Sequence, residues 1–155
     1  MNQTVLIADG DAELCDIYQR YFTVHGYDVE TSLDGVDCLE RLRQLEPAVL
    51  VLDQALRWGR ADGVLAWLRD ESLMPRIPVI LMTTGGYLQD FSEFLGLPIV
   101  DCLPKPFALT VLLEKVRSAV AKQGRREPPE LNRNGHGAVD QMKRMTFPCP
   151  SPLLS

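Results

Sequence analysis

The chain has 155 residues, of which 46% are hydrophobic and 24% are charged, and these values are those of one ordinary globular domain. Its net charge is −5, and residues 1–121 hold ten Lys and Arg against eighteen Asp and Glu, a balance that argues against direct binding of nucleic acid. No stretch is long and apolar enough to span a membrane, and the N-terminus lacks the charged and apolar parts of a signal peptide, so a cytoplasmic location without membrane contact is expected.

The first predicted strand is the apolar run at residues 5–8, and the acidic turn Asp9-Gly10-Asp11 follows it. Asp11 precedes a helical pattern and is expected to be its N-cap, because its carboxylate can accept the free N–H groups of the first turn. Gly26 stands where a residue in the left-handed conformation would end that helix. The inward stripe of the helix is predicted to consist of Leu14, Ile17, Tyr18, Tyr21 and Phe22.

A second strand at residues 29–31 and a turn at Asp34-Gly35 lead into a second helix. The third strand is the apolar run at residues 48–52, which ends directly at Asp53. The inward stripe of the second helix is predicted to be Val36, Leu39 and Leu42.

The loop after Asp53 contains Arg57, Trp58, Gly59 and Arg60 and leads to a third helix. A tryptophan on such a polar loop fits either an anchor for a partner or a lid, and the sequence does not separate these two roles. The inward stripe of the third helix is predicted to be Val64, Trp67 and Leu68.

Two more strands complete the pattern, at residues 79–82 and 99–103. Thr83 follows the first of them, and Lys105, between two prolines, follows the second. A fourth helix is expected from Gly85 to Phe94 or Leu95. The inward stripe of the fifth helix is predicted to be Leu109, Leu112, Val116 and Val120.

Five strands that alternate with five helices predict a doubly wound α/β domain, with a parallel sheet covered by helices on both faces. We place this domain at residues 1–122. Residues 123–155 contain five prolines and no periodic apolar stripe, so this Pro-rich tail is predicted to be disordered. The four cysteines are widely separated and form no CxxC pair, which predicts buried free thiols and neither a zinc site nor a disulfide framework.

Polar side chains follow four of the five strands, namely Asp9, Asp53, Thr83 and Lys105. The carboxyl ends of parallel strands meet at one edge of a sheet, where ligands bind, so these residues are expected to share a pocket. Asp9 or Asp53 alone would more simply be a strand-end residue that bonds a turn, but two at matched strand ends favour a functional site. Thr84 leaves the position of the hydroxyl ambiguous, and the interval to Lys105 favours Thr83.

The motifs at residues 5–9, 51–53, 77–83 and 103–107, together with the turn at Asp34-Gly35, resemble the receiver domain of two-component response regulators. The resemblance covers about residues 3–121. It implies a flavodoxin-like fold, with five helices and the strand order 2-1-3-4-5, in a stand-alone receiver of the CheY-like kind.

The resemblance also implies the chemistry of a phosphorelay. Asp53 would accept a phosphoryl group from a sensor histidine kinase or a phosphotransfer protein, Lys105 would pair with the phosphoryl oxygens, and the hydroxyl of Thr83 would move to bond one of them. The implied cofactor is Mg²⁺, held by Asp9, Asp53 and the backbone carbonyl of Ala55. A downstream protein would bind the face formed by the fourth helix, the fifth strand and the fifth helix.

Three departures from the family pattern concern this chemistry. Gly10 stands where the family has its second acidic residue, so weak magnesium binding is expected unless Asp11 supplies the missing ligand. Cys102 stands where the family has an aromatic ring that follows the switch hydroxyl, so the change transmitted to the output face is expected to be small. The loop after Asp53 is longer than usual and lacks the usual proline.

These departures leave a second function open, that of a pseudo-receiver which binds a protein partner without being phosphorylated. A third class, a phosphatase with Asp53 as its nucleophile, is disfavoured, because the second residue after Asp53 is Ala55 and not another aspartate. The sequence therefore predicts a signalling protein and not an enzyme.

Overall fold

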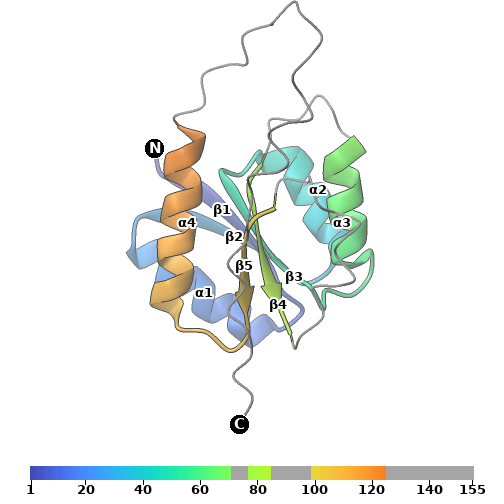
Figure 1. Ribbon diagram of the computed structural model, residues 1–155, viewed down its shortest axis with the longest axis horizontal. Coiled ribbons are helices and arrows are strands. Elements are labelled where there is room, and N and C mark those ends of the chain that lie inside the picture. The colour runs from blue at the N-terminus through green and yellow to red at the C-terminus, as the bar shows by residue number, and fades with distance from the viewer. Residues whose placement is uncertain (71–76, 85–98, 125–155) are drawn as a thin grey trace, which may run out of the picture.

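The computed structural model describes residues 1–70, 77–84 and 99–124 (Figure 1). Within these residues the chain alternates between strands and helices. The elements are β1 (Gln3–Ala8), α1 (Ala12–Val24), β2 (Tyr27–Ser32), α2 (Gly35–Leu45), β3 (Val49–Asp53), α3 (Arg60–Asp70), β4 (Val79–Thr83), β5 (Ile99–Pro104) and α4 (Leu109–Gln123). The helix expected from Gly85 and the tail beyond residue 124 lie outside the described residues, so the helix counted fifth from the sequence is α4.

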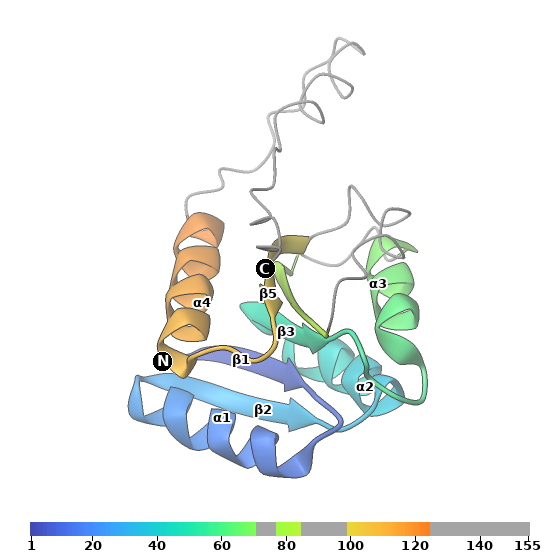
Figure 2. The same cartoon turned by 60° about the horizontal axis from the view of Figure 1, so that its bottom comes forward.

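The five strands form one parallel sheet in the order β2-β1-β3-β4-β5, which confirms the predicted topology. Helices α1 and α4 cover one face of the sheet, and α2 and α3 cover the other (Figures 1 and 2). The strand register aligns the carboxyl ends, because Ala8 pairs with Leu52 and Asp53 with Met82. Residues that follow these strands therefore emerge at the same edge of the sheet.

Two hydrophobic cores lie on the two faces of the sheet. Alternate residues of β3 divide between them, with Val49 and Val51 in the core under α1 and α4, and Leu50 and Leu52 in the core under α2 and α3. Both faces are covered, which explains why β3 is apolar throughout and has no polar alternation.

The predicted helix stripes are correct for most residues and wrong at Ile17 and Val36, which are 48% and 62% exposed. In α1 the buried positions are Cys15, Tyr18 and Phe22, and in α2 they are Gly35, Cys38 and Leu42. Both helices bury a small cysteine at the core-facing position, and the large aliphatic residue two positions away points elsewhere, because 200° of helical rotation separates the two.

The buried thiols predicted from the sequence are confirmed for Cys15 and Cys38, whereas Cys102 is half-buried and Cys149 lies outside the described residues. Burial is the main cause that raises the pKa of Cys15 to about 11 and that of Cys38 to about 12. Both side chains are therefore neutral components of the cores at physiological pH.

The start of α2 is fixed against the loop that follows β3. The backbone N–H of Gly35 donates to the carbonyl of Arg57 at 3.0 Å, and that of Val36 donates to the carbonyl of Trp58 at 3.1 Å. A Cβ atom on Gly35 would lie 2.7 Å from the Trp58 carbonyl oxygen, closer than real Cβ contacts. Gly35 was predicted only as part of a turn, but here it permits two backbone segments to touch.

Replacing Gly35 with alanine is expected to lower the free energy of unfolding by about 1–3 kcal/mol, because the added methyl group forces backbone against backbone. Gly63 provides the matched control, since a Cβ there meets nothing within 4 Å. Gly63→Ala should leave stability unchanged or raise it by up to about 1 kcal/mol through helix propensity. Urea denaturation measures both, and equal stability of the two variants would contradict the close approach at Gly35.

Candidate functional site

Asp9, Asp53, Thr83 and Lys105 come together at the carboxyl edge of the sheet. Asp9 is 1% exposed, Asp53 5% and Thr83 8%, and all three are buried polar residues at strand ends. Lys105 follows β5, where its backbone N–H donates to the carbonyl of Thr83 at 2.8 Å. The four residues thus lie at one edge of the sheet, as expected, and their shared role in a functional site stays a prediction.

Lys105 lies between the two buried carboxylates. Its ammonium Nζ donates to Oδ2 of Asp9 at 2.7 Å and is 3.4 Å from Oδ2 of Asp53. A buried carboxylate needs a paired charge or hydrogen bonds to offset its desolvation, and one ammonium serves both groups here. The sequence predicted a pairing of Lys105 with phosphoryl oxygens but gave no sign of its contact with Asp9.

Backbone amides hold the remaining oxygens of the two carboxylates. Oδ1 of Asp9 accepts the N–H of Asp11 at 2.9 Å, and Oδ1 of Asp53 accepts the N–H of Ala55 at 3.1 Å. Both bonds are of the short i to i+2 kind by which an aspartate stabilises its own turn. Each carboxylate is therefore fixed on one oxygen by its turn and faces Lys105 with the other.

The balance of burial and charge shifts the protonation of this pair. Burial is the largest cause that raises the pKa of Asp53, and the charge of Asp9 adds to it, while the Ala55 N–H and Lys105 oppose it. Burial alone would lower the pKa of Lys105, but its hydrogen bond to Asp9 and the charges of Asp53 and Asp9 raise it on balance. Lys105 therefore stays protonated, and the charged form of Asp53 is disfavoured relative to an aspartate in water.

Asp11 acts as the N-cap of α1, as predicted. Its Oδ1 accepts the N–H groups of Glu13 and Leu14 at 3.0 and 3.2 Å. This role engages one of the two carboxylate oxygens of Asp11, the residue expected to replace the missing magnesium ligand if any does. Gly10 itself has room, because a Cβ there would meet only the carbonyl oxygen of Leu33, at an ordinary 3.8 Å.

The ligands at the site are of the type that a hard divalent cation prefers, but they are few. Asp9 and Asp53 supply carboxylate oxygens, which Mg²⁺ prefers. Among the described residues, however, no three His, Cys, Asp or Glu side chains are grouped so that they could bind a metal ion together. Gly10 adds no side-chain ligand beside Asp9 and Asp53.

Two neighbouring positions were also singled out from the sequence. Thr83 ends β4 and is buried, whereas Thr84 is exposed. Cys102 is half-buried on β5, and packs against the core under α2 and α3.

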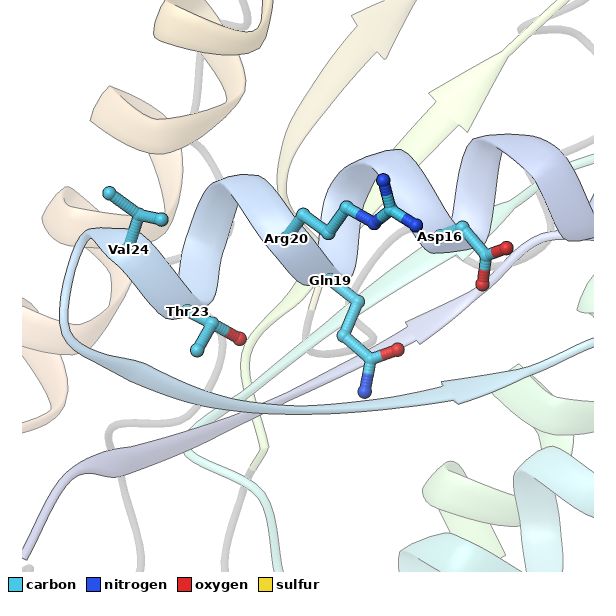
Figure 3. A pocket seen from close by; sticks show the side chains of 5 residues that line it. All are labelled: Asp16, Gln19, Arg20, Thr23 and Val24. Atoms are coloured by element: carbon cyan, nitrogen blue, oxygen red, sulfur yellow. The ribbon is translucent and has the colours of Figure 1, made fainter.

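A separate open hollow lies along the outer side of α1, lined by Asp16, Gln19, Arg20, Thr23 and Val24, and includes none of the predicted site residues (Figure 3).

The match to a family model defines the class of protein. The model of the response regulator receiver domain matches residues 5–117, and the chain belongs to that family. Receiver domains are the signalling domains of two-component systems, and response regulators interact with histidine kinases or phosphotransfer proteins. No helix in residues 1–70, 77–84 and 99–124 has the length and hydropathy needed to cross a membrane.

Particular relatives and solved structures agree with this class. The response regulator MprA of Mycobacterium bovis is 31% identical over 130 residues, which are 84% of this chain and 54% of that protein. Its counterpart in Mycobacterium avium is 31% identical over 126 residues, 81% of this chain and 53% of that protein. The chain thus spans about half the length of the curated relatives that it matches.

Among solved structures, the receiver domain of the Francisella response regulator 1452 has a TM-score of 0.70 at 25% identity, covering 78% of this chain and 98% of that one. A CheY-like receiver domain protein from Methanospirillum hungatei has a TM-score of 0.71 at 22% identity, covering 80% and 98%. The latter likeness concerns the fold.

Proposed function

We propose that this receiver accepts a phosphoryl group on Asp53 from a histidine kinase or phosphotransfer protein and thereby changes its affinity for a protein partner. The observation that carries the proposal is the arrangement of one ammonium between two buried carboxylates at the carboxyl edge of the sheet. The proposed role is signalling in the cytoplasm and not enzymatic turnover of a substrate.

The geometry of Asp53 supports its role as the nucleophile. Its Oδ1 is held by the Ala55 N–H, and burial raises its pKa, which indicates a carboxylate that is oriented and poorly solvated. In the transfer, a carboxylate oxygen forms a bond to phosphorus while the bond between phosphorus and the donor nitrogen breaks. Lys105, 3.4 Å from Oδ2 of Asp53, would pair with the oxygens of the arriving phosphoryl group, and Thr83 would supply a hydroxyl to one of them.

Magnesium is part of the proposal as a weakly bound cofactor. Asp9, Asp53 and the backbone carbonyl of Ala55 would hold it, and when bound it offsets negative charge on the phosphoryl oxygens. Gly10 leaves the cation with fewer ligands. Lys105 already neutralises part of the negative charge of the two carboxylates, so less of that charge is left to attract the cation. Both effects weaken its binding.

Gly10→Asp is expected to tighten magnesium binding by about 10–100-fold, because it restores a carboxylate at the position where a Cβ has room and the backbone φ suits any residue. Calorimetric titration with Mg²⁺ measures the change. Gly10→Asn, of equal size but neutral, is the matched control and should gain much less. Equal affinities of Gly10→Asp and the unmodified protein would contradict the assignment of the missing ligand to this position.

The proposed function is tested by incubating the protein with Mg²⁺ and acetyl phosphate and measuring its intact mass. We expect one added phosphate that is lost on treatment with hydroxylamine, since an acyl phosphate is cleaved by that nucleophile and a phosphoserine is not. A protein that gains no phosphate from acetyl phosphate, or from any purified histidine kinase of the same organism, would contradict the proposal.

Gly10 and Cys102 favour a second candidate, a pseudo-receiver that binds its partner without phosphorylation. Amide chemical shifts with beryllofluoride and Mg²⁺ separate the two candidates. Changes confined to the pocket favour the binding module, and changes that extend through β5 to the face with α4 favour a phosphorylation-dependent switch. Because a ring is absent at Cys102, we expect changes at that face to be smaller than those in the pocket.

A further inference from the structure

The loop at residues 57–60, called the Trp58 loop below, exposes a large apolar side chain to solvent. Trp58 is 78% exposed. Val36 is 62% exposed, and the hydrogen bond from its N–H to the Trp58 carbonyl places its backbone beside the loop. Leu33, 47% exposed, lies two residues before Gly35, whose N–H donates to the Arg57 carbonyl. Exposed apolar residues gathered at one place, and not scattered, mark an interaction site.

The backbone of the Trp58 loop has an unfavourable conformation that contacts with neighbouring residues must stabilise. Trp58, Gly59 and Arg60 have consecutive positive φ angles of 47°, 90° and 43°. Non-glycine residues adopt this region at a cost in free energy, and such strain persists where the neighbouring structure fixes it and where function requires it. Here the neighbour is the start of α2, which holds the backbone of Trp58 in place, so binding does not have to order that backbone.

Two arginines, Arg57 and Arg60, flank Trp58 within the loop, on a body that is otherwise acidic. Arg57 forms no ion pair with any described residue, and Nε of Arg60 is 3.7 Å from Oδ1 of Asp62, with both side chains largely exposed. The acidic groups at the start of α2 are already engaged. Asp34 caps the helix, and Asp37 pairs with Arg41 at 2.9 Å.

We infer that Leu33, Val36 and the Trp58 loop form a docking surface for an acidic protein segment. In this complex an apolar side chain of the segment packs on Trp58, and flanking carboxylates pair with Arg57 and Arg60. Tryptophan and arginine are the residue types that most often dominate the free energy of binding at interfaces, and arginine pairs with carboxylates through two parallel hydrogen bonds.

We infer a protein segment, and not a nucleic acid, because the positive charge is confined to two arginines. Two arginines on an acidic body form an isolated cationic spot, whereas a phosphate backbone requires a continuous basic face. The inference goes beyond the proposed function, since none of its residues accepts or contacts a phosphoryl group. The surface borders the Asp53 pocket, so a bound segment lies at the rim of that pocket.

Fluorescence of Trp58 tests the inference. Trp67→Phe leaves Trp58 as the only tryptophan of the chain. The probe is a synthetic helical peptide with a leucine and phenylalanine stripe flanked by glutamates, and the matched peptide carries lysines in place of the glutamates. We expect a saturable blue shift of the emission with the acidic peptide and none with the basic one.

Anisotropy of the labelled acidic peptide then measures the variants. Trp58→Asn, whose asparagine tolerates a positive φ, should bind at least about tenfold more weakly, and so should Arg57→Glu. Arg117→Glu, on α4 across the sheet, removes an exposed arginine elsewhere and should bind as the unmodified protein does.

Several results would overturn the inference: no shift with the acidic peptide, equal binding of both peptides, or undiminished binding by Trp58→Asn or Arg57→Glu. Tighter binding of single-stranded DNA or of anionic phospholipid vesicles would also overturn it, because the surface would then serve another class of ligand. Self-association lost in Trp58→Asn, measured by sedimentation, would assign the surface to a second copy of the chain instead.

Discussion

Asp53→Asn is expected to abolish the incorporation of phosphate from acetyl phosphate without lowering the melting temperature. Asparagine keeps an oxygen for the N–H of Ala55, and the remaining ion pair of Lys105 with Asp9 at 2.7 Å is untouched. The substitution also removes a carboxylate whose pKa burial raises, so the folded state loses an unfavourable charge. Intact mass and thermal unfolding together measure both effects.

Asp9→Asn is the control for Asp53→Asn, because it removes the other carboxylate of the same pocket. It should reduce the rate of labelling and still allow one phosphate per chain, since Asp9 is not the proposed nucleophile. Full labelling of Asp53→Asn, or a phosphate mapped to Asp9, would assign the acceptor to another residue. A loss of labelling that accompanies unfolding would show instead that Asp53 is required for the fold.

Lys105→Met is expected to lower the free energy of unfolding by about 3 kcal/mol, because it leaves Asp9 and Asp53 buried without a cation. The estimate is at the low end for a broken buried pair, since the side chain of Lys105 is 18% exposed. The corresponding fall in melting temperature is roughly 6–12 °C. Thermal unfolding measures this fall. A change in melting temperature below experimental error would mean that hydration stabilises the two carboxylates as well as Lys105 does.

The defect of Lys105→Met should shrink as the pH falls. Burial already raises the pKa of Asp53 in the native protein, and loss of the ammonium raises it further. The folded variant then binds protons that the unfolded chain releases, so its stability rises as the pH is lowered from about 7 toward 5. Lys105→Met combined with Asp9→Asn removes the repulsion and should recover much of the loss at neutral pH.

The sequence predicted the sheet well, and with it the edge at which the candidate site residues meet, because both follow from short-range patterns. Apolar runs buried on two faces are recognisable without knowledge of their partners, and the parallel arrangement brings Asp9, Asp53 and Lys105 to one edge whatever the detailed packing. Asp11 as an N-cap and Gly26, with a φ of 88°, are equally local, and both predictions are confirmed.

The sequence could not predict features that depend on which segments touch. The stripes with Ile17 and Val36 were wrong, because in both helices a small cysteine, Cys15 or Cys38, and not the more hydrophobic residue faces the core. The contact between Lys105 and Asp9 joins residues 96 positions apart and has no local signature. The signal that could have predicted this contact is the excess of negative charge expected in the pocket, because buried carboxylates need a cation beside them.

The hydrogen bonds of Gly35 and Val36 to the carbonyls of Arg57 and Trp58 make two surface loops one cooperative unit. Neither loop can open alone without leaving two amides and two carbonyls unpaired, so local unfolding here involves both or neither. The second loop begins at the amide that holds Asp53, and α2 is joined to the edge strand β2 through Arg41 and Glu30. A disturbance at Asp53, the proposed phosphoacceptor, therefore has a mechanical route to the β2 edge of the sheet, on the side remote from β5.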